Sequence, residues 1–183
     1  DNSTSEQDFI LDLFEEGLPC LHLRKDNRTE EEYKNWLENI PKSYRDRIII
    51  HQHAVLAEKY ELAGVHFKST DVAVPSTIPR GKSVHSLSEI MGEIDRYYLS
   101  PVFPSISKKG YSGDLDHKEV ERYLKETERD YKIYALGGID DMKAQQSLDM
   151  GFDGVVVLGY VWGEISLDKR KDKVKRLIEI TSK

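Results

Sequence analysis

The sequence contains a single cysteine, Cys20, so neither an internal disulfide nor a cysteine-rich metal site can form. No apolar run approaches the ~20 residues that a membrane-spanning helix needs. The first residues contain neither the basic nor the apolar segment of a signal peptide. Lysine and arginine form no cluster, and the net charge is −6, which argues against nucleic acid or an anionic membrane as the main partner. These absences predict a soluble, cytoplasmic protein.

The composition predicts one folded domain over residues 1–183. Charged residues make up 33% of the chain, but they are mixed along it rather than gathered in blocks, which excludes intrinsic disorder. A length of 183 residues is enough to bury a substantial core within a single domain.

Hydrophobic periodicity predicts a regular alternation of short apolar strands and helices. The expected strands lie at 20–24, 47–51, 64–67, 82–85, 97–100, 131–136 and 155–158. The expected helices lie at 5–16, 29–39, 55–62, from 86 onward, 117–128, 140–150 and 168–181. The chain therefore begins with a helix and continues through seven strands.

Repeated strand–helix units predict the α/β class and a parallel sheet with right-handed crossovers. Two architectures fit this pattern, an open doubly wound sheet and a (β/α)₈ TIM barrel. Seven strands preceded by a helix favour a barrel that lacks its first strand. A strand of ~5–6 residues upstream of residue 1 would complete it.

Histidines gather at the ends of the expected strands, where a barrel places its reactive groups. Five of the six histidines lie at or just beyond such ends: His22, His51, His53, His66 and His85. Each alone is explained by a hydrogen bond at the barrel rim, but five together suggest a site. His51 and His53 alternate along one strand and share a face, as zinc ligands do. We rank that zinc interpretation low because the strand ends at this point.

Glycines and a polar loop predict an anion-binding region. Gly137 and Gly138 follow one late strand and Gly159 follows the next, and barrels often bind phosphate through backbone N–H groups at these places. The loop after residue 100 adds hydroxyls and a cation at Ser105, Ser107 and Lys108. A long loop of this kind is more often functional than a simple connection.

A set of motifs in a fixed order carries a family resemblance. The set comprises His22-Leu23-Arg24, Gly64-Val65-His66 with Asp71, Gly81-Lys82-Ser83-Val84-His85-Ser86, Ser100-Pro101-Val102-Phe103-Pro104-Ser105 with Ser107-Lys108, Leu136-Gly137-Gly138-Ile139, and Val155-Val156-Val157-Leu158-Gly159. Over essentially the whole chain it resembles the thiamine phosphate synthase family and its thiazole tautomerase branch, TenI. The resemblance implies a (β/α)₈ barrel and a role in thiamine biosynthesis.

The resemblance to the synthase implies that hydroxymethylpyrimidine pyrophosphate is joined to thiazole phosphate with release of pyrophosphate, which needs Mg²⁺. Arg24 matches a pyrophosphate-binding arginine and Asp71 a metal-binding aspartate. The substrate-binding positions are matched by Ser83, Ser105, Ser107 and Lys108.

The chain departs from the synthase pattern at two places. An Arg-x-Lys motif is replaced by Arg24-Lys25-Asp26, where Lys25 would substitute one residue early. An Asn-Asp pair is replaced by His51-Gln52, and the neutral Gln52 weakens the expected Mg²⁺ site because a hard dication favours charged oxygens.

The resemblance to the tautomerase branch is closer around His85 and implies no metal cofactor. That reaction moves a proton to aromatise a thiazole phosphate carboxylate, and His85 is the expected catalytic base. Gly137, Gly138 and Gly159 would bind the phosphate, and Ser107 and Lys108 the carboxylate.

A thiazole tautomerase is the preferred function at this stage, a thiamine phosphate synthase is the alternative, and a catalytically silent phosphate-binding barrel is the third hypothesis. The expected partner in each case is a small thiazole phosphate. The resemblance also allows a homo-oligomer.

Overall fold

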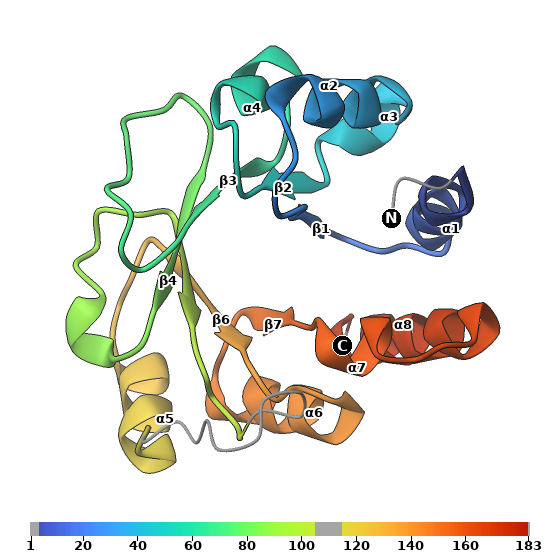
Figure 1. The fold of residues 1–183 in the computed structure, drawn as a ribbon. Helices are drawn as coiled ribbons and strands as arrows, with labels where there is room; N and C mark the ends of the chain where they lie inside the picture. The colour runs from blue at the N-terminus through green and yellow to red at the C-terminus, as the bar shows by residue number, and fades with distance from the viewer. Residues whose placement is uncertain (1–3, 105–114, 183) are drawn as a thin grey trace. The chain divides into compact units, whose positions relative to one another are not determined.

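The computed structural model describes residues 4–104 and 115–182, with side chains from residue 6 onward. Two compact units make up the chain, Asp1–Gly81 (unit 1) and Lys82–Lys183 (unit 2). Figure 1 shows both units and labels most of their elements. The hydrogen-bonded order of the strands follows their order in the sequence, from β1 to β7.

Unit 1 is built from parallel strands joined through helices. Its elements are α1 (Thr4–Glu15), β1 (Leu21–Leu23), α2 (Glu30–Glu38), α3 (Lys42–Arg45), β2 (Ile48–Ile50), α4 (Val55–Lys59) and β3 (Gly64–Phe67). Strand β2 pairs with both β1 and β3 in parallel register. Strand β4 (Arg80–Val84) begins in unit 1 and ends in unit 2.

Local sequence explains the elements of unit 1. All three isoleucines of β2 are buried, as expected of a strand covered on both faces. Helix α2 starts with a capping box, in which the Thr29 hydroxyl accepts the Glu32 N–H and the Glu32 carboxylate accepts the Thr29 N–H. Gly17, just after helix α1, has a φ of +96°, the left-handed conformation that commonly terminates a helix.

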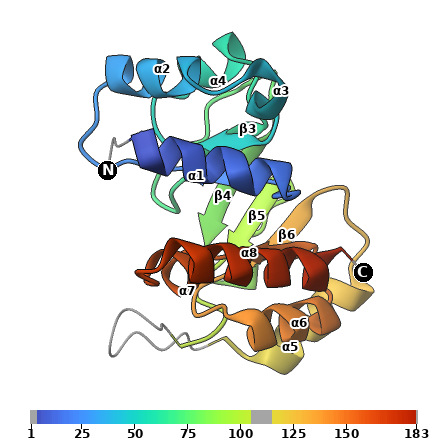
Figure 2. The same ribbon diagram turned by 90° about the vertical axis from the view of Figure 1, so that its right-hand side faces the viewer.

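Unit 2 repeats the strand–helix pattern. Its elements are a 3₁₀ turn (Leu87–Glu89), β5 (Arg96–Leu99), α5 (His117–Glu126), β6 (Lys132–Leu136), α6 (Asp141–Met150), β7 (Gly154–Val156), α7 (Gly159–Trp162) and α8 (Leu167–Thr181). Strand β6 pairs in parallel with β5 and with β7. Helix α8 packs against α6, as Figure 2 shows.

The predicted alternation is confirmed, with three local corrections. All seven expected strands are present, and 64–67 matches β3 at both ends. The helix expected from residue 86 is a single 3₁₀ turn, because Ile90 already adopts an extended conformation and β5 begins at Arg96. The short helices α3 and α7 were not predicted, since four residues are too few to show helical periodicity.

The fold class is therefore α/β with a parallel sheet, as predicted. In the part of the chain that the structure describes, no helix combines the length and the apolar character needed to cross a bilayer.

We expect Gly138→Ala to destabilise the protein by about 3 kcal/mol or more. Gly138 has a φ of +67°, and an added Cβ would lie 2.4 Å from the Pro104 carbonyl oxygen and 2.6 Å from that of Phe103. The matched control is Gly17→Ala, where φ is +96° but no atom lies within 4 Å, so that only about 1–2 kcal/mol of backbone strain is expected. Urea unfolding of both variants measures the difference, and equal losses would contradict the close packing at Gly138.

Candidate functional site

Three histidines of unit 1 converge at the carboxyl ends of consecutive strands. His22 lies on β1, His51 directly follows β2, and His66 lies on β3. His22 Nδ1 is 3.0 Å from His51 Nε2 and 3.4 Å from His66 Nδ1. The rings of His51 and His66 stack with their centroids 4.2 Å apart. We call these three residues the histidine triad.

Strand register explains why the triad forms. His22 is opposite Ile49, and Ile50 is opposite Val65, so residue 51 follows in line with residue 66. Because side chains alternate between the two faces of a sheet, positions 22, 49, 51 and 66 all lie on one face. The triad thus follows from parallel pairing.

Burial keeps two of the triad rings neutral. It lowers the pKa of His51 to about 4, and the positive charge of Arg24 lowers it further. It also lowers the pKa of His66 to about 2, with His51 and His22 adding to the effect. A neutral imidazole has one N–H donor and one nitrogen lone pair, so both rings can act as ligands or hydrogen-bond acceptors near neutral pH.

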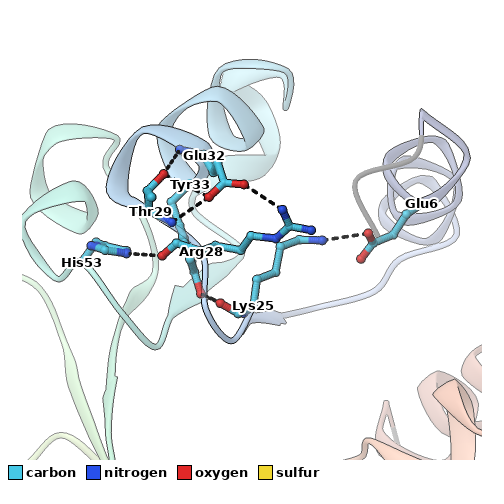
Figure 3. A network of polar contacts seen from close by, with 7 residues as sticks. All are labelled: Glu6, Lys25, Arg28, Thr29, Glu32, Tyr33 and His53. Atoms are coloured by element: carbon cyan, nitrogen blue, oxygen red, sulfur yellow. Dashed lines mark hydrogen bonds and ion pairs between the residues drawn. The ribbon is translucent and has the colours of Figure 1, made fainter.

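The two cations expected to bind substrate in unit 1 have acidic partners. Arg24 is exposed and its Nε lies 3.3 Å from an Asp26 carboxylate oxygen. The Lys25 ammonium lies 2.8 Å from the carboxylate of Glu6 on α1, an ion pair that Figure 3 shows. With 13% of its side chain exposed, Lys25 must leave this pair before it can bind an anion.

Tyr33 connects Lys25 to Gln52. Its hydroxyl accepts the Lys25 backbone N–H at 2.8 Å and donates to Gln52 Oε1 at 2.8 Å. Burial raises the pKa of Tyr33, so the phenol keeps the proton that it donates. The Gln52 amide oxygen therefore accepts its hydrogen bond from the Tyr33 hydroxyl.

The described residues of unit 1 do not fit a resident Mg²⁺ ion. The Asp71 carboxylate accepts the Lys68 backbone N–H at 2.8 Å, within its own turn. Among residues 4–104 and 115–182, the group of three potential metal ligands is the histidine triad, which contains no carboxylate. Mg²⁺ favours charged oxygens, and Asp71 supplies only one carboxylate. A Mg²⁺ ion bound there would therefore need most of its ligands from a substrate or from water.

His53 does not join the triad, although it shares a strand face with His51 in the sequence. Its φ of +55° turns the chain after β2, and its Nε2–H donates to the Arg28 carbonyl at 3.1 Å (Figure 3). The structure therefore separates the His51–His53 pair that the sequence suggested as zinc ligands.

His85 follows β4 and belongs to unit 2. Its Nδ1 lies 2.6 Å from the Ser100 carbonyl oxygen, and since a carbonyl only accepts, Nδ1 carries the proton. In the neutral ring Nε2 is then the basic nitrogen. The residue is exposed. Ser83 lies on β4 and is partly buried.

The predicted phosphate-binding glycines also lie in unit 2. Gly137 and Gly138 follow β6 with φ values of +93° and +67°, and Gly159 begins the four-residue helix α7. The Phe103 N–H donates to the Gly137 carbonyl at 3.2 Å, which ties the segment after β5 to this turn. Ser105, Ser107 and Lys108 lie outside the described residues.

Sequence reasoning placed His51 among the binding residues but missed its neighbours His22 and His66 as direct contacts. The sequence does contain a hint of this contact, since each of the three histidines lies within or directly after an apolar strand. It could be used only with the strand register, which relates residues 29 and 44 positions apart.

Comparison with known proteins assigns the family. The family model described as thiamine monophosphate synthase matches residues 1–161. A thiamine-phosphate synthase from Listeria monocytogenes serovar 1/2a is 28% identical over 167 residues, covering 79% of this chain and 76% of the relative.

Solved structures similar to this chain include two thiamine phosphate pyrophosphorylases. A thiamine phosphate pyrophosphorylase from Bacteroides thetaiotaomicron has a TM-score of 0.84 and 27% identity, covering 100% of this chain and 93% of that one. A pyrophosphorylase of the same name from Pyrococcus furiosus has a TM-score of 0.78 at 18% identity and shows likeness of fold. The chain belongs to the thiamine monophosphate synthase family.

We expect acidification from pH 6.5 to pH 4 to lower the free energy of unfolding. An unfolded histidine has a pKa near 6.5, so in this range the unfolded chain binds protons that the folded His51 and His66 do not bind. Each group contributes up to ~1.4 kcal/mol per pH unit.

The measurement is denaturant unfolding at a series of pH values in metal-free buffer. The double variant His51→Asn, His66→Gln should show a flatter profile than the wild type in this range. A double variant with the wild-type slope would contradict the depressed pKa values.

Proposed function

We propose that this protein is a thiamine phosphate synthase, a transferase that joins hydroxymethylpyrimidine pyrophosphate to thiazole phosphate. Family membership over residues 1–161 carries the proposal. The names of the relatives favour the synthase, which was the alternative, over the tautomerase preferred from the sequence. The expected partners are therefore two small phosphorylated molecules.

We also infer that residues 1–183 form a single domain of the (β/α)₈ barrel type, to which the described residues contribute seven strands. Seven strands in sequence order and the parallel pairing within each unit support this inference. In such a barrel the residues after each strand share one end, which is where the predicted site residues occur.

In the proposed reaction the thiazole nitrogen forms a bond to the pyrimidine methylene carbon while the carbon–oxygen bond to pyrophosphate breaks. The electron pair of that bond goes to the leaving pyrophosphate, so the site must stabilise growing negative charge. Arg24 is an exposed cation just beyond β1. We assign it to the pyrophosphate, with Lys25 joining once it leaves Glu6.

The remaining residues are assigned to substrate binding. Gln52 and His51 follow β2 and would contact the pyrimidine substrate. Backbone N–H groups of the predicted glycine turns would bind the thiazole phosphate. The residues proposed for these roles are His51, Gln52, Ser83, Ser105, Ser107, Lys108, Gly137, Gly138 and Gly159.

The direct test is an assay of the purified chain with both substrates, with and without added Mg²⁺, following thiamine phosphate formation and pyrophosphate release. We expect equal amounts of the two products. Arg24→Gln should lower kcat/KM for the pyrimidine substrate by roughly tenfold or more, since it removes charge-assisted hydrogen bonds to pyrophosphate. Lys34→Gln, which removes a partly buried cation that pairs with Glu31 on α2, is the control. Absence of pyrophosphate release under every condition would refute the synthase assignment.

His85 supports a second candidate function, the tautomerase reaction. The Ser100 carbonyl holds the proton on Nδ1 and so leaves Nε2 as the base, which suits a group that removes and returns a proton. Proton exchange on thiazole carboxylate phosphate measures this activity. His85→Ala should reduce the rate about 10²- to 10⁴-fold, the usual contribution of a general base. His53→Ala serves as the control.

An unchanged exchange rate in His85→Ala would refute the role of His85 as the base of the tautomerase reaction. Binding of thiazole phosphate without either activity would instead support the silent binding barrel.

A further inference from the structure

The histidine triad brings three ring nitrogens to one place. His22 Nδ1 faces His51 Nε2 at 3.0 Å and His66 Nδ1 at 3.4 Å. A ring nitrogen carries either one in-plane hydrogen or one in-plane lone pair. In the neutral rings, each of these nitrogens can therefore present a lone pair toward a shared metal ion when the hydrogen is on the other ring nitrogen.

A metal ion placed between the three nitrogens could accept one lone pair from each of them. Nitrogen ligands bind Zn²⁺ at 2.0–2.1 Å, so two ligands at a tetrahedral angle lie about 3.3 Å apart. The observed separations of 3.0 and 3.4 Å bracket this value. One ligating atom from each residue lies within 4.8 Å of the other two.

The chemistry of the donors selects the kind of metal. Imidazole nitrogen suits Zn²⁺ and neighbouring transition metals, whereas Mg²⁺ takes oxygen ligands. Three protein ligands in tetrahedral coordination leave a fourth position for water or a substrate atom. The same residues that fit Mg²⁺ poorly thus fit a zinc-class ion well.

The backbone segments that carry the triad are held by strand hydrogen bonds. His22 and His66 lie on hydrogen-bonded strands, and the His51 backbone N–H donates to the Leu23 carbonyl at 3.2 Å. His66 is 4% exposed. A site held on strands in fixed register loses little freedom when the ion binds, which favours binding.

We propose that His22, His51 and His66 form a binding site for Zn²⁺ or a similar divalent transition metal, with His22 and His66 ligating through Nδ1 and His51 through Nε2. This site goes beyond the proposed transferase function. It is tested without either substrate, so failure of one proposal leaves the other standing.

The experiment uses the full chain without an affinity tag, freed of metal with a chelator and titrated with Zn²⁺ by calorimetry. We expect one ion bound per chain. Loss of a group that only supports a metal ligand costs about 10- to 100-fold in affinity, so His22→Gln, His51→Asn and His66→Gln should each cost at least that much. His53→Gln removes a nearby histidine outside the triad and should bind as the wild type does.

A measurement on the wild-type chain guards against variants that fail to fold. Nitrogen-15 NMR of the histidine rings should show Zn²⁺-induced shifts at Nδ1 of His22 and His66 and at Nε2 of His51. Co²⁺ in place of Zn²⁺ should give the visible absorption of tetrahedral coordination. Absence of stoichiometric binding, or shifts confined to other histidines, would overturn the proposal.

Discussion

The parallel register of β1, β2 and β3 is the constraint on which the candidate site of unit 1 depends. Pairing of Leu23 with Ile50 and of Ile50 with Val65 places the residues at the carboxyl ends of three strands side by side. A shift of one residue in either pair would turn one strand's side chains to the opposite face. Such a shift would move that strand's histidine off the shared face and separate the triad. The histidine triad is therefore a direct consequence of this pairing.

The chemistry at this end of unit 1 differs from what the family resemblance implies. Where the synthase pattern has an Asn-Asp pair, this chain has His51 and Gln52, and Gln52 is held by the Tyr33 hydroxyl. Nitrogen replaces oxygen as the prevailing donor, and burial lowers the pKa of His51 and His66 and so keeps both rings neutral. Because His51 and Gln52 follow the end of β2, substitutions at these positions can change the available donor atoms while the fold is kept.

Much of the fold could be predicted from the sequence because its strands are short apolar runs and its helices have clear start signals. The helices expected at 29–39 and 140–150 are present, and their N-caps are Thr29 and Asp140. The helix expected from residue 86 proved to be only a turn at Leu87–Glu89, because its apolar pattern does not show how soon the next strand begins. The candidate site residues were chosen because they lie near strand ends in the sequence. The contact of His22 with His66 depends on strand register. The Lys25–Glu6 ion pair depends on where α1 packs. Neither is encoded in a local pattern.

The most direct test of this account is anomalous diffraction at the zinc absorption edge from crystals of the full chain grown with Zn²⁺. We expect one strong peak between His22 Nδ1, His51 Nε2 and His66 Nδ1, with a fourth ligand from outside the triad. Absence of a peak at the triad, or a zinc ion bound by other residues alone, would contradict it.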